Sequence, residues 1–407
     1  MRFRMLGELD VRGKRVLVRA DLNVPMDDGR IVDRLRLRRQ ASTIRELAEQ
    51  GARVIILSHF GRPNGRPDPA LSLKPVADEF AKEVGRPVGF AGNCIGPLAE
   101  SAVDALEDGQ ILLLENTRFH PSENENDPHF VKQLAALGEI FVNDAFSASH
   151  RAHASTYGIA QILPSYAGRA MEKELQHLEL VLTKPKRPLM AVVGGAKVST
   201  KIALLQNLAC QVETLVIGGA MANTFLAAQG LEVGRSLYEP DYLDTARRVI
   251  HVAEERGCVL ILPSDVVVAK KLEPWAPHRT VPVDQIMADE MALDVGPKTI
   301  AAFRNRLAIS KTLVWNGPFG AFETPPFESG TIAAARVAAE ATKAGHLLSV
   351  AGGGDTVAAI AMAGVEFDFT YVSTAGGAFL EWLEGKELPC VKALSRSSDE
   401  VVTHLVN

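Results

Sequence analysis

Short apolar runs alternate with amphipathic segments from one end of the chain to the other. The runs are rich in β-branched residues and apolar on both faces, which is typical of strands in a parallel sheet that is covered on both sides. They read RVLVRADL, RVIILSHF, QILLLENTRF, EIFVNDAF, PLMAVVGG, TLVIGGAM, VLILPSDVVVA, KTLVWNGP, LLSVAGGG and FTYVSTAGG. Nearly every unusual residue of the chain stands directly after one of these predicted strands.

Segments with helical periodicity separate the strands. One predicted helix covers Asp33 to Gln50, with Asp33 as N-cap and Gly51 as the residue that stops it. Another covers Ser199 to Val212, with Ser199 as N-cap. The alternation predicts an α/β fold of doubly wound, Rossmann-like αβα domains, each with three layers and a parallel sheet. Ligands of such sheets bind beyond the carboxyl ends of the strands.

The chain is long enough for two domains. Its 407 residues exceed the roughly 100–200 that one domain usually takes. The segment MEKELQHLELVLTK has the pattern of a single helix, and Pro185 and Pro188 follow it. We therefore predict an interdomain helix and hinge at 171–187, between a first domain at 1–170 and a second at 188–389.

Composition and charge narrow the range of partners. A hydrophobic content of 47% and a charged content of 23% are typical of globular proteins. The net charge of -5 argues against nucleic acid or a membrane surface as partner. The N-terminus has no apolar signal segment, and no stretch reaches the ~18 apolar residues of a membrane span. The four cysteines form no C-x-x-C pair, so we expect reduced thiols in a cytoplasmic protein.

Cationic residues follow the strands of the first half. A parallel sheet brings such residues to one edge, where several arginines repel one another unless an anion lies between them. Small polyanions are therefore the expected ligands. The alternative is that each arginine pairs with a surface carboxylate, and the pair His150 and His153 could instead hold a metal, although no acidic third ligand is in register. The cationic residues after strands are His59, Arg62, Arg118, His150, Arg151 and His153. Arg36 joins them from the start of a predicted helix, and Asp21 and Asn23, which follow the first strand, add hydrogen-bonding groups.

Glycine-rich segments follow the strands of the second half. They are GGAKVSTK (194–201), GGAMANTF (218–225), NGPFGAFE (316–323), GGGDT (352–356) and STAGGA (373–378). Glycine lets backbone N–H groups approach phosphate, and a helix that begins there adds a favourable field. One such segment would more simply be a tight turn, but five predict a nucleotide site. The chain contains neither G-x-x-x-x-G-K-[ST] nor G-x-G-x-x-G, so it is not an ordinary P-loop or dinucleotide-binding protein.

Polar residues beside these glycines suit a bound nucleotide. Lys197 and Lys201 stand one helical turn apart and could meet phosphate charge. Asp355 could hold Mg²⁺ against phosphate oxygens, although an isolated Asp there would as often be a helix N-cap. Thr356 could donate to phosphate, and Glu323 could accept from ribose hydroxyls.

Together these segments resemble the phosphoglycerate kinase family over nearly the whole chain. The resemblance rests on RADLNVP, SHFGRPNGRPDP, LLLENTRFH, NDAFSASHRAHAST, GGAKVSTKI, LPSDVVVA, DVGPKTI, VWNGPFGAFE, GGGDTVAAI and AFLEWLEGKELP, in this order. It implies reversible phosphoryl transfer from 1,3-bisphosphoglycerate to ADP, with Mg²⁺ and ADP or ATP as co-substrate, by a cytoplasmic monomer. It also implies that residues 390–407 return to the first domain.

The resemblance assigns a role to each matching position. Substrate would bind Asp21, Leu22, Asn23, Arg36, His59, Phe60, Gly61, Arg62, Arg118 and Arg151. Nucleotide would bind Gly195, Lys197, Lys201, Gly219, Asn316, Pro318, Glu323, Gly353, Gly354, Asp355 and Thr356, with Asp355 on the metal side. Catalysis would rest on Arg36, Lys197, Gly353 and Gly376, and Arg36 and Lys197 would stabilise the phosphoryl group in flight.

Four positions depart from the family pattern. Thr200 stands where the family usually has Asp, and Ser147, Ala220 and Ala375 replace glycines. Two other functions remain open from the residues: a kinase for another small carboxylate, and a two-lobed ligand-binding protein without catalysis. Since the ligands of a kinase would start on different domains, we expect the domains to close about 171–187.

Overall fold

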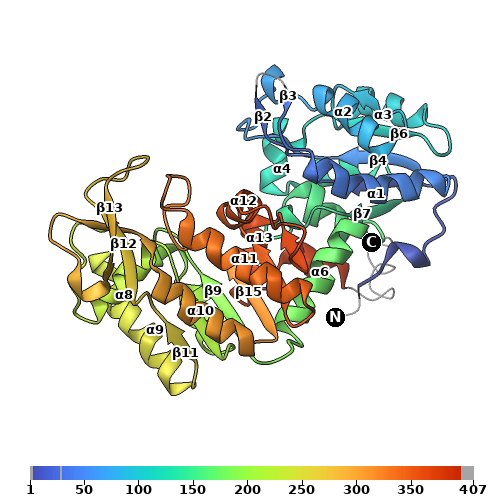
Figure 1. Cartoon of the computed structure of the whole chain (residues 1–407). Coiled ribbons are helices and arrows are strands. Elements are labelled where there is room, and N and C mark those ends of the chain that lie inside the picture. The colour runs from blue at the N-terminus through green and yellow to red at the C-terminus, as the bar shows by residue number, and fades with distance from the viewer. Residues whose placement is uncertain (1–2, 28–29, 396–407) are drawn as a thin grey trace. The chain divides into compact units, whose positions relative to one another are not determined.

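The computed structural model describes residues 3–27 and 30–395, which divide into two compact units (Figure 1). Unit 1 contains the chain up to Leu175 together with the segment from Glu387, and unit 2 is Gln176–Lys386. Helix α6 (Arg169–Leu182) contains the division between them. Of the segment 390–407, the end of α14 (Pro389–Leu394) lies in unit 1, and residues 396–407 are outside the described residues.

Unit 1 is built on a six-stranded parallel sheet in the order β5-β6-β4-β1-β7-β8. The strands are β1 (Arg15–Arg19), β4 (Arg53–Leu57), β5 (Gly89–Ala91), β6 (Ile111–Leu114), β7 (Ile140–Asn143) and β8 (Ser165–Ala167). The strand order reverses at β1, because β4 lies on one side of it and β7 on the other. A reversal of this kind opens a ligand-binding crevice at the carboxyl ends of the two flanking strands.

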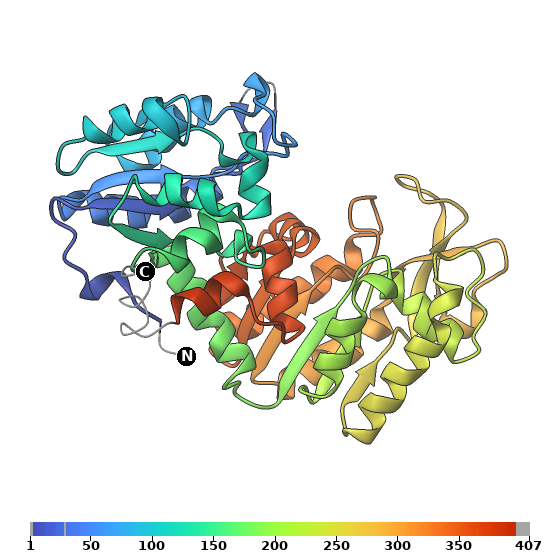
Figure 2. The same cartoon turned by 180° about the vertical axis from the view of Figure 1, so that it is seen from behind.

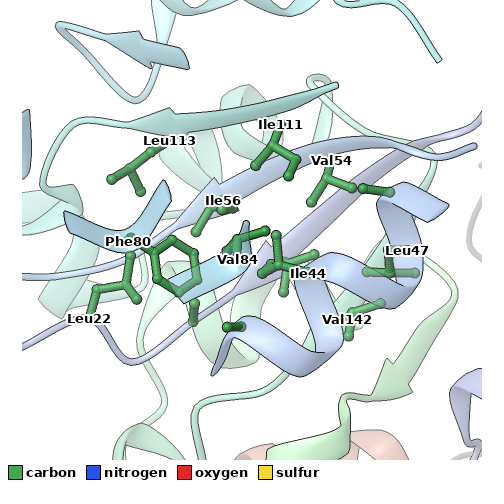
Figure 3. Close-up of a cluster of buried hydrophobic side chains, with 14 of the residues drawn as sticks. Leu22, Ile44, Leu47, Val54, Ile56, Phe80, Val84, Ile111, Leu113 and Val142 are labelled. Atoms are coloured by element: carbon green, nitrogen blue, oxygen red, sulfur yellow. The ribbon is translucent and has the colours of Figure 1, made fainter. Parts of the chain in front are cut away.

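Alternate residues of each strand pack on opposite faces of this sheet. Val54 and Ile56 belong to one buried cluster (Figure 3), and Ile55 and Leu57 belong to another on the opposite face. Helices α1 (Leu35–Glu49) and α2 (Lys74–Val84) supply the first cluster. The second contains residues of α3 (Gly96–Asp104), α5 (Pro128–Ala135) and α14. Unit 1 therefore has the predicted three layers, and its strands are apolar on both faces for this reason.

Unit 2 repeats this plan with the order β11-β10-β9-β15-β16-β17, again all parallel (Figure 2). The strands are β9 (Leu189–Val193), β10 (Thr214–Ile217), β11 (Val259–Ile261), β15 (Thr312–Asn316), β16 (Leu348–Gly352) and β17 (Tyr371–Ser373). The order reverses at β9. Its helices are α7 (Ile202–Ala209), α8 (Met221–Ala228), α9 (Leu243–Glu255), α10 (Pro297–Ile309), α11 (Ser329–Lys343), α12 (Gly354–Met362) and α13 (Gly376–Leu383).

One part of unit 2 differs from the prediction. The run VLILPSDVVVA is two strands, β11 and β12 (Asp265–Ala269), because Pro263 interrupts it. Strand β12 leaves the parallel sheet and pairs antiparallel with β13 (His278–Pro282) and β14 (Met291–Val295). Strand β13 has mostly exposed side chains, so hydrophobic periodicity gave no sign of it.

Two predicted helix starts are wrong. Helix α1 begins at Leu35 with Arg34 at the N-cap position, and Asp33 instead accepts a hydrogen bond from the Leu35 N–H. Helix α7 begins at Ile202, because Ser199 lies in the short 3₁₀ turn η7 (Val198–Thr200) and its hydroxyl donates to Glu239. The predicted stop at Gly51 is confirmed by its positive φ of 83° directly after α1.

Other elements of unit 1 are short. They include the strand pair β2 (Met26–Asp27) and β3 (Arg30–Ile31), helix α4 (Pro121–Glu125), the 3₁₀ turns η3 (Thr117–Phe119) and η4 (Phe146–Ala148), and the short π-helix η5 (Ala154–Gly158). None of the helices within residues 3–27 and 30–395 has the length and apolarity needed to cross a membrane.

Candidate active site

Unit 1 gathers its cations at the carboxyl edge of the sheet, after β1, β4, β6 and β7. Burial and the neighbouring charges of Arg19, Arg151 and Arg62 lower the pKa of Arg118 to about 10. Burial and the charges of Arg118, Arg19, Arg151 and His150 lower the pKa of His153 to about 4. Since neighbouring cations contribute to the lowered pKa of both Arg118 and His153, several positive charges lie within Coulomb range at this edge, and an anion would relieve their repulsion.

Asp21 organises the hydrogen bonds next to this cluster. Its Oδ2 accepts from NH1 of Arg36 at 2.6 Å and from Oγ of Ser147 at 2.6 Å. The Oδ1 of Asn23 accepts from the Gly61 N–H at 2.9 Å, which ties the segment after β1 to the segment after β4. Ser147, which departs from the family pattern, thus gives Asp21 a donor in addition to Arg36 and the Asn23 N–H.

A buried amide fixes the loops that follow β4 and β6. The Oδ1 of Asn116 accepts from the N–H groups of Phe60 and Arg118, and its Nδ2 donates to Phe60 O at 2.7 Å. The Leu22 N–H donates to Oγ of Ser58 at 3.1 Å. Phe60 and Leu22 are buried, so their predicted contact with substrate would come through backbone groups. Sequence analysis did not single out Asn116 or Ser58.

Two of the predicted arginines are on the surface of this edge. Arg62 and Arg151 are exposed, and Nε of Arg151 donates to Nε2 of His150 at 3.1 Å. The chain near Arg151 is held from α14, because the Cys390 N–H donates to Ser149 O and its Sγ lies 3.4 Å from Arg151 O. Exposed guanidinium groups can turn toward a phosphate without breaking a buried contact.

A buried charge pair under this edge was missed from the sequence. Arg19 is 1% exposed and Glu123 is 0% exposed, and Ser155 joins them by accepting from Arg19 Nε and donating to Glu123. Burial lowers the pKa of Arg19 and raises the pKa of Glu123, and the opposite charge of each partner opposes these shifts. The signal available in the sequence was an arginine at the end of an otherwise apolar strand.

In unit 2 the glycine segments after β9, β10 and β15 pack directly on one another. The Gly194 N–H donates to Asn316 O at 2.8 Å. A Cβ on Gly194 would lie 2.0 Å from Pro318 O, and one on Gly219 would lie 2.6 Å from the backbone of Gly195. These positions require glycine, because the three backbones lie so close together that backbone atoms occupy the place where a side chain would be.

Lys201 joins the glycine segments by its ammonium group. Its Nζ donates to Gly194 O at 2.5 Å and to Oδ1 of Asn316 at 2.6 Å. Burial lowers the pKa of Lys201 to about 8, and the charge of Asp355 opposes that shift. Thr356 is buried, and its Oγ1 accepts from the Gly317 N–H at 2.6 Å.

A cavity of about 340 Å³ opens beside these segments within unit 2. Five predicted nucleotide residues line it: Gly195, Gly219, Pro318, Glu323 and Asp355. Its apolar wall comes from residues that sequence analysis did not predict, namely Leu237, Leu272, Met291 and Leu293. They come from three separate segments, so no local pattern connects them. An apolar wall with a few polar groups suits a flat heteroaromatic ring.

The other predicted residues lie outside this cavity. Lys197 is exposed just before η7, and Gly353 and Gly354 begin α12 with Gly353 at a φ of 100°. Gly376 begins α13, which follows strand β17, and β17 pairs with β16, the strand that precedes α12. The two helix N-termini therefore follow adjacent strands, which favours anion binding at this edge.

The remaining departures from the family pattern are also in unit 2. Ala220 lines the cavity with an ordinary right-handed φ of −64°, and Ala375 is buried at the N-cap position of α13. Thr200 is exposed, and its hydroxyl donates to Lys197 O at 2.9 Å. Thr200 removes the carboxylate that the family usually has at this position, and none of the arginines, lysines or acidic residues predicted for the site is replaced.

The donors present fit a metal that arrives with a nucleotide. Within the described part of the chain, no three His, Cys, Asp or Glu side chains are grouped closely enough to hold a metal ion. Asp355 offers one exposed carboxylate at the start of α12. Mg²⁺ commonly binds through one or two carboxylates together with substrate phosphates, so this donor set suits a magnesium nucleotide.

Comparison with known proteins gives one consistent family. The family model described as "Phosphoglycerate kinase" matches residues 6–386. The phosphoglycerate kinase of Azorhizobium caulinodans is 61% identical over 97% of this chain and 99% of its own length, and that of Zymomonas mobilis is 59% identical over 97% and 100%. The solved phosphoglycerate kinase of Coxiella burnetii superposes with a TM-score of 0.89 at 43% identity, covering 97% of this chain and 99% of its own.

Proposed function

This chain belongs to the phosphoglycerate kinase family, and from that premise we propose how its residues divide the reaction. The chain is a kinase that transfers a phosphoryl group between 1,3-bisphosphoglycerate and ADP, the ATP-producing step of glycolysis. The proposal concerns which residues bind each substrate, and it is carried by one observation. Arg62, Arg118 and Arg151 follow different strands, and yet Arg62 and Arg151 lie within Coulomb range of Arg118 at one edge of the unit 1 sheet, and such a group of guanidiniums suits a polyanion.

The phosphoglycerate binds at this edge in the proposal. Arg62, Arg118 and Arg151 hold phosphate, since a guanidinium fork matches phosphate oxygens and stays charged. The groups around Asp21 and His59 orient the rest of the molecule by hydrogen bonds. These contacts would position the carboxyl group that accepts or releases the phosphoryl group.

The adenine nucleotide binds to unit 2 in the proposal. Its base enters the apolar cavity, its ribose reaches Glu323, and its phosphates meet Lys201 and the N-termini of α12 and α13. Asp355 would hold Mg²⁺, which neutralises phosphate charge when it is bound. The nucleophile in the ATP-consuming direction is an ionised carboxylate that needs no general base. Catalysis then depends on alignment and on charge stabilisation by Arg36, Lys197 and the backbone at Gly353 and Gly376.

A substitution separates catalysis from binding. Lys197→Ala should lower kcat by at least about 100-fold, because one positioned donor to transition-state charge is worth that much. Binding of 3-phosphoglycerate, measured by calorimetry, should stay within about threefold of wild type because Lys197 is in unit 2. The exposed Lys298, changed to Ala, is the matched control. A kcat for Lys197→Ala equal to that of the control would rule out its catalytic role.

We also propose where the protein is located, its oligomeric state and a motion of its domains. We propose a cytoplasmic monomer without nucleic-acid partners, which size-exclusion chromatography with light scattering would test for oligomeric state. The four cysteines Cys94, Cys210, Cys258 and Cys390 are free thiols, in keeping with a reducing compartment. Closure of the two domains about 171–187 stays a prediction, and solution scattering with both substrates should report compaction.

A further inference from the structure

The buried contact between Arg19 and His59 carries an inference that rests on the substrate role proposed for His59. NH2 of Arg19 lies 2.8 Å from Nδ1 of His59. A guanidinium group has only donors, so Nδ1 must be the acceptor and carries no proton. In a neutral imidazole the proton is then on Nε2. We propose that Arg19 is a positioning residue that holds His59 in the Nε2–H tautomer, so that His59 presents a donor to phosphoglycerate.

The surroundings of His59 keep the ring neutral. It is 7% exposed, and the charged or titratable groups that face it are Arg19, Arg118, Arg36 and His153. Burial and these groups lower its pKa well below the usual value. An imidazolium would also place an N–H against the Arg19 donor. His59 therefore contributes a hydrogen bond to a bound anion without contributing charge.

Arg19 itself is held so that it acts through His59. Its Nε donates to Ser155 Oγ at 2.9 Å and its NH1 donates to Ala20 O at 2.5 Å, so each guanidinium nitrogen has a protein partner. Ser155 in turn donates to Glu123 from its hydroxyl at 2.5 Å and from its N–H at 2.9 Å. The buried carboxylate balances the guanidinium charge and fixes its direction.

The tautomer can be read directly from the wild-type protein. Histidine labelled with ¹⁵N in the full-length enzyme gives long-range ¹H–¹⁵N spectra in which protonated and bare ring nitrogens are well separated. The chain has ten histidines, and the spectrum of His59→Gln identifies the signals of residue 59. We expect a bare Nδ1 and a protonated Nε2 at neutral pH. A protonated Nδ1, alone or with Nε2, would overturn the inference.

Two variants test the donor itself. Gln at position 59 can place its amide NH2 near the site of Nε2, whereas Asn reaches only near the site of Nδ1. We expect the KM for 3-phosphoglycerate to be about tenfold higher in His59→Asn than in His59→Gln, which is the effect of one hydrogen bond to a charged group. Equal KM values in the two variants would overturn the donor role. If both also equalled wild type, His59 would not be a substrate ligand at all, while the tautomer assignment would stand.

The role of Arg19 needs a charge-balanced change. The double variant Arg19→Met with Glu123→Gln removes the donor to Nδ1 together with its buried counter-charge. We expect His59 to populate both tautomers in it and the KM for 3-phosphoglycerate to rise. An unchanged pure Nε2–H signal would show that Arg19 does not hold the ring. Should this variant fail to fold, the wild-type spectrum still tests the contact, because a guanidinium donor that faces Nδ1 excludes a proton there and a protonated Nδ1 would show that Arg19 does not hold the ring.

Discussion

Replacing Gly194 by Ala should disrupt the nucleotide half through steric overlap alone. The added Cβ would lie 2.0 Å from Pro318 O and 2.8 Å from the Gly317 carbonyl, whereas ordinary contacts begin near 3.4 Å. The facing backbone must therefore move by about 1.4 Å. It is held in place, because the Gly317 N–H donates to Thr356 and its carbonyl accepts from Trp315 Nε1. The Gly194 backbone lies outside the left-handed region, so no φ strain adds to the effect.

The expected cost follows from these contacts. Overpacking costs about 1–3 kcal/mol, and here a backbone rather than a flexible side chain must yield. The hydrogen bonds from Gly194 N to Asn316 O and from Lys201 Nζ to Gly194 O are at risk, at about 1 kcal/mol net each. A loss of about 3 kcal/mol lowers the melting temperature by roughly 6–12 °C for a domain of 150–250 residues. The KM for ADP should rise at least about tenfold, since the same segments would receive the nucleotide.

Calorimetry and steady-state kinetics would measure both effects. Gly92→Ala is the matched control, because a Cβ there meets nothing within 4 Å and its backbone is not left-handed. The KM for 3-phosphoglycerate should be little changed in Gly194→Ala. If Gly194→Ala melted within about 1 °C of the control and kept its KM for ADP, the close approach of the glycine segments would not matter and the reasoning would be refuted.

Three more predictions concern protonation and buried amides. The kcat/KM for ADP should fall above about pH 8, because the Lys201 ammonium is lost as pH rises through its lowered pKa, and Lys201→Arg should flatten that profile. Gln40 accepts from the Asp21 N–H and donates to Asp144 O, so Gln40→Leu should lower the free energy of unfolding by about 2 kcal/mol in denaturant titrations and raise the KM for 3-phosphoglycerate. Ser147→Ala should raise the same KM by a few-fold, because it removes the hydroxyl that donates to Asp21 Oδ2. Burial raises the pKa of Asp144 to about 7, so between about pH 4 and pH 7 the unfolded carboxyl is ionised and the folded one is not. The free energy of unfolding should therefore decline as pH rises through that range. Denaturant unfolding across the same range should show a smaller decline in Asp144→Asn.

Most of the framework could be predicted because it rests on local signals. Strands buried on both faces are apolar on both faces, and helices between them imply parallel order. Strand β13 was not predicted, because its side chains are mostly exposed. The starts of α1 and α7 were misplaced, because Asp33 accepts from the Leu35 N–H from outside the N-cap position and the Ser199 hydroxyl donates to Glu239. A capping residue can satisfy several nearby donors, and sequence does not say which one it chooses.

The charged and glycine residues of the candidate site could be predicted from the sequence, whereas the apolar residues that line the nucleotide cavity could not. Arginines and glycines that follow strands are visible in sequence because a parallel sheet brings all such positions to one edge. The apolar lining of the nucleotide cavity comes from Leu237, Leu272, Met291 and Leu293, which are ordinary core-type residues in separate segments. Arg19 and Glu123 become a pair only through Ser155, more than a hundred residues from Arg19.

The ionisable groups of this protein, and the strand that each of them follows, can be read from the order of its residues. Their protonation behaviour depends on the folded arrangement, which lowers the pKa of Lys201 to about 8 and that of Arg118 to about 10 and places Nδ1 of His59 against an Arg19 donor. The reason is that desolvation and Coulomb interactions depend on distances through space, and folding sets those distances between residues far apart in the chain.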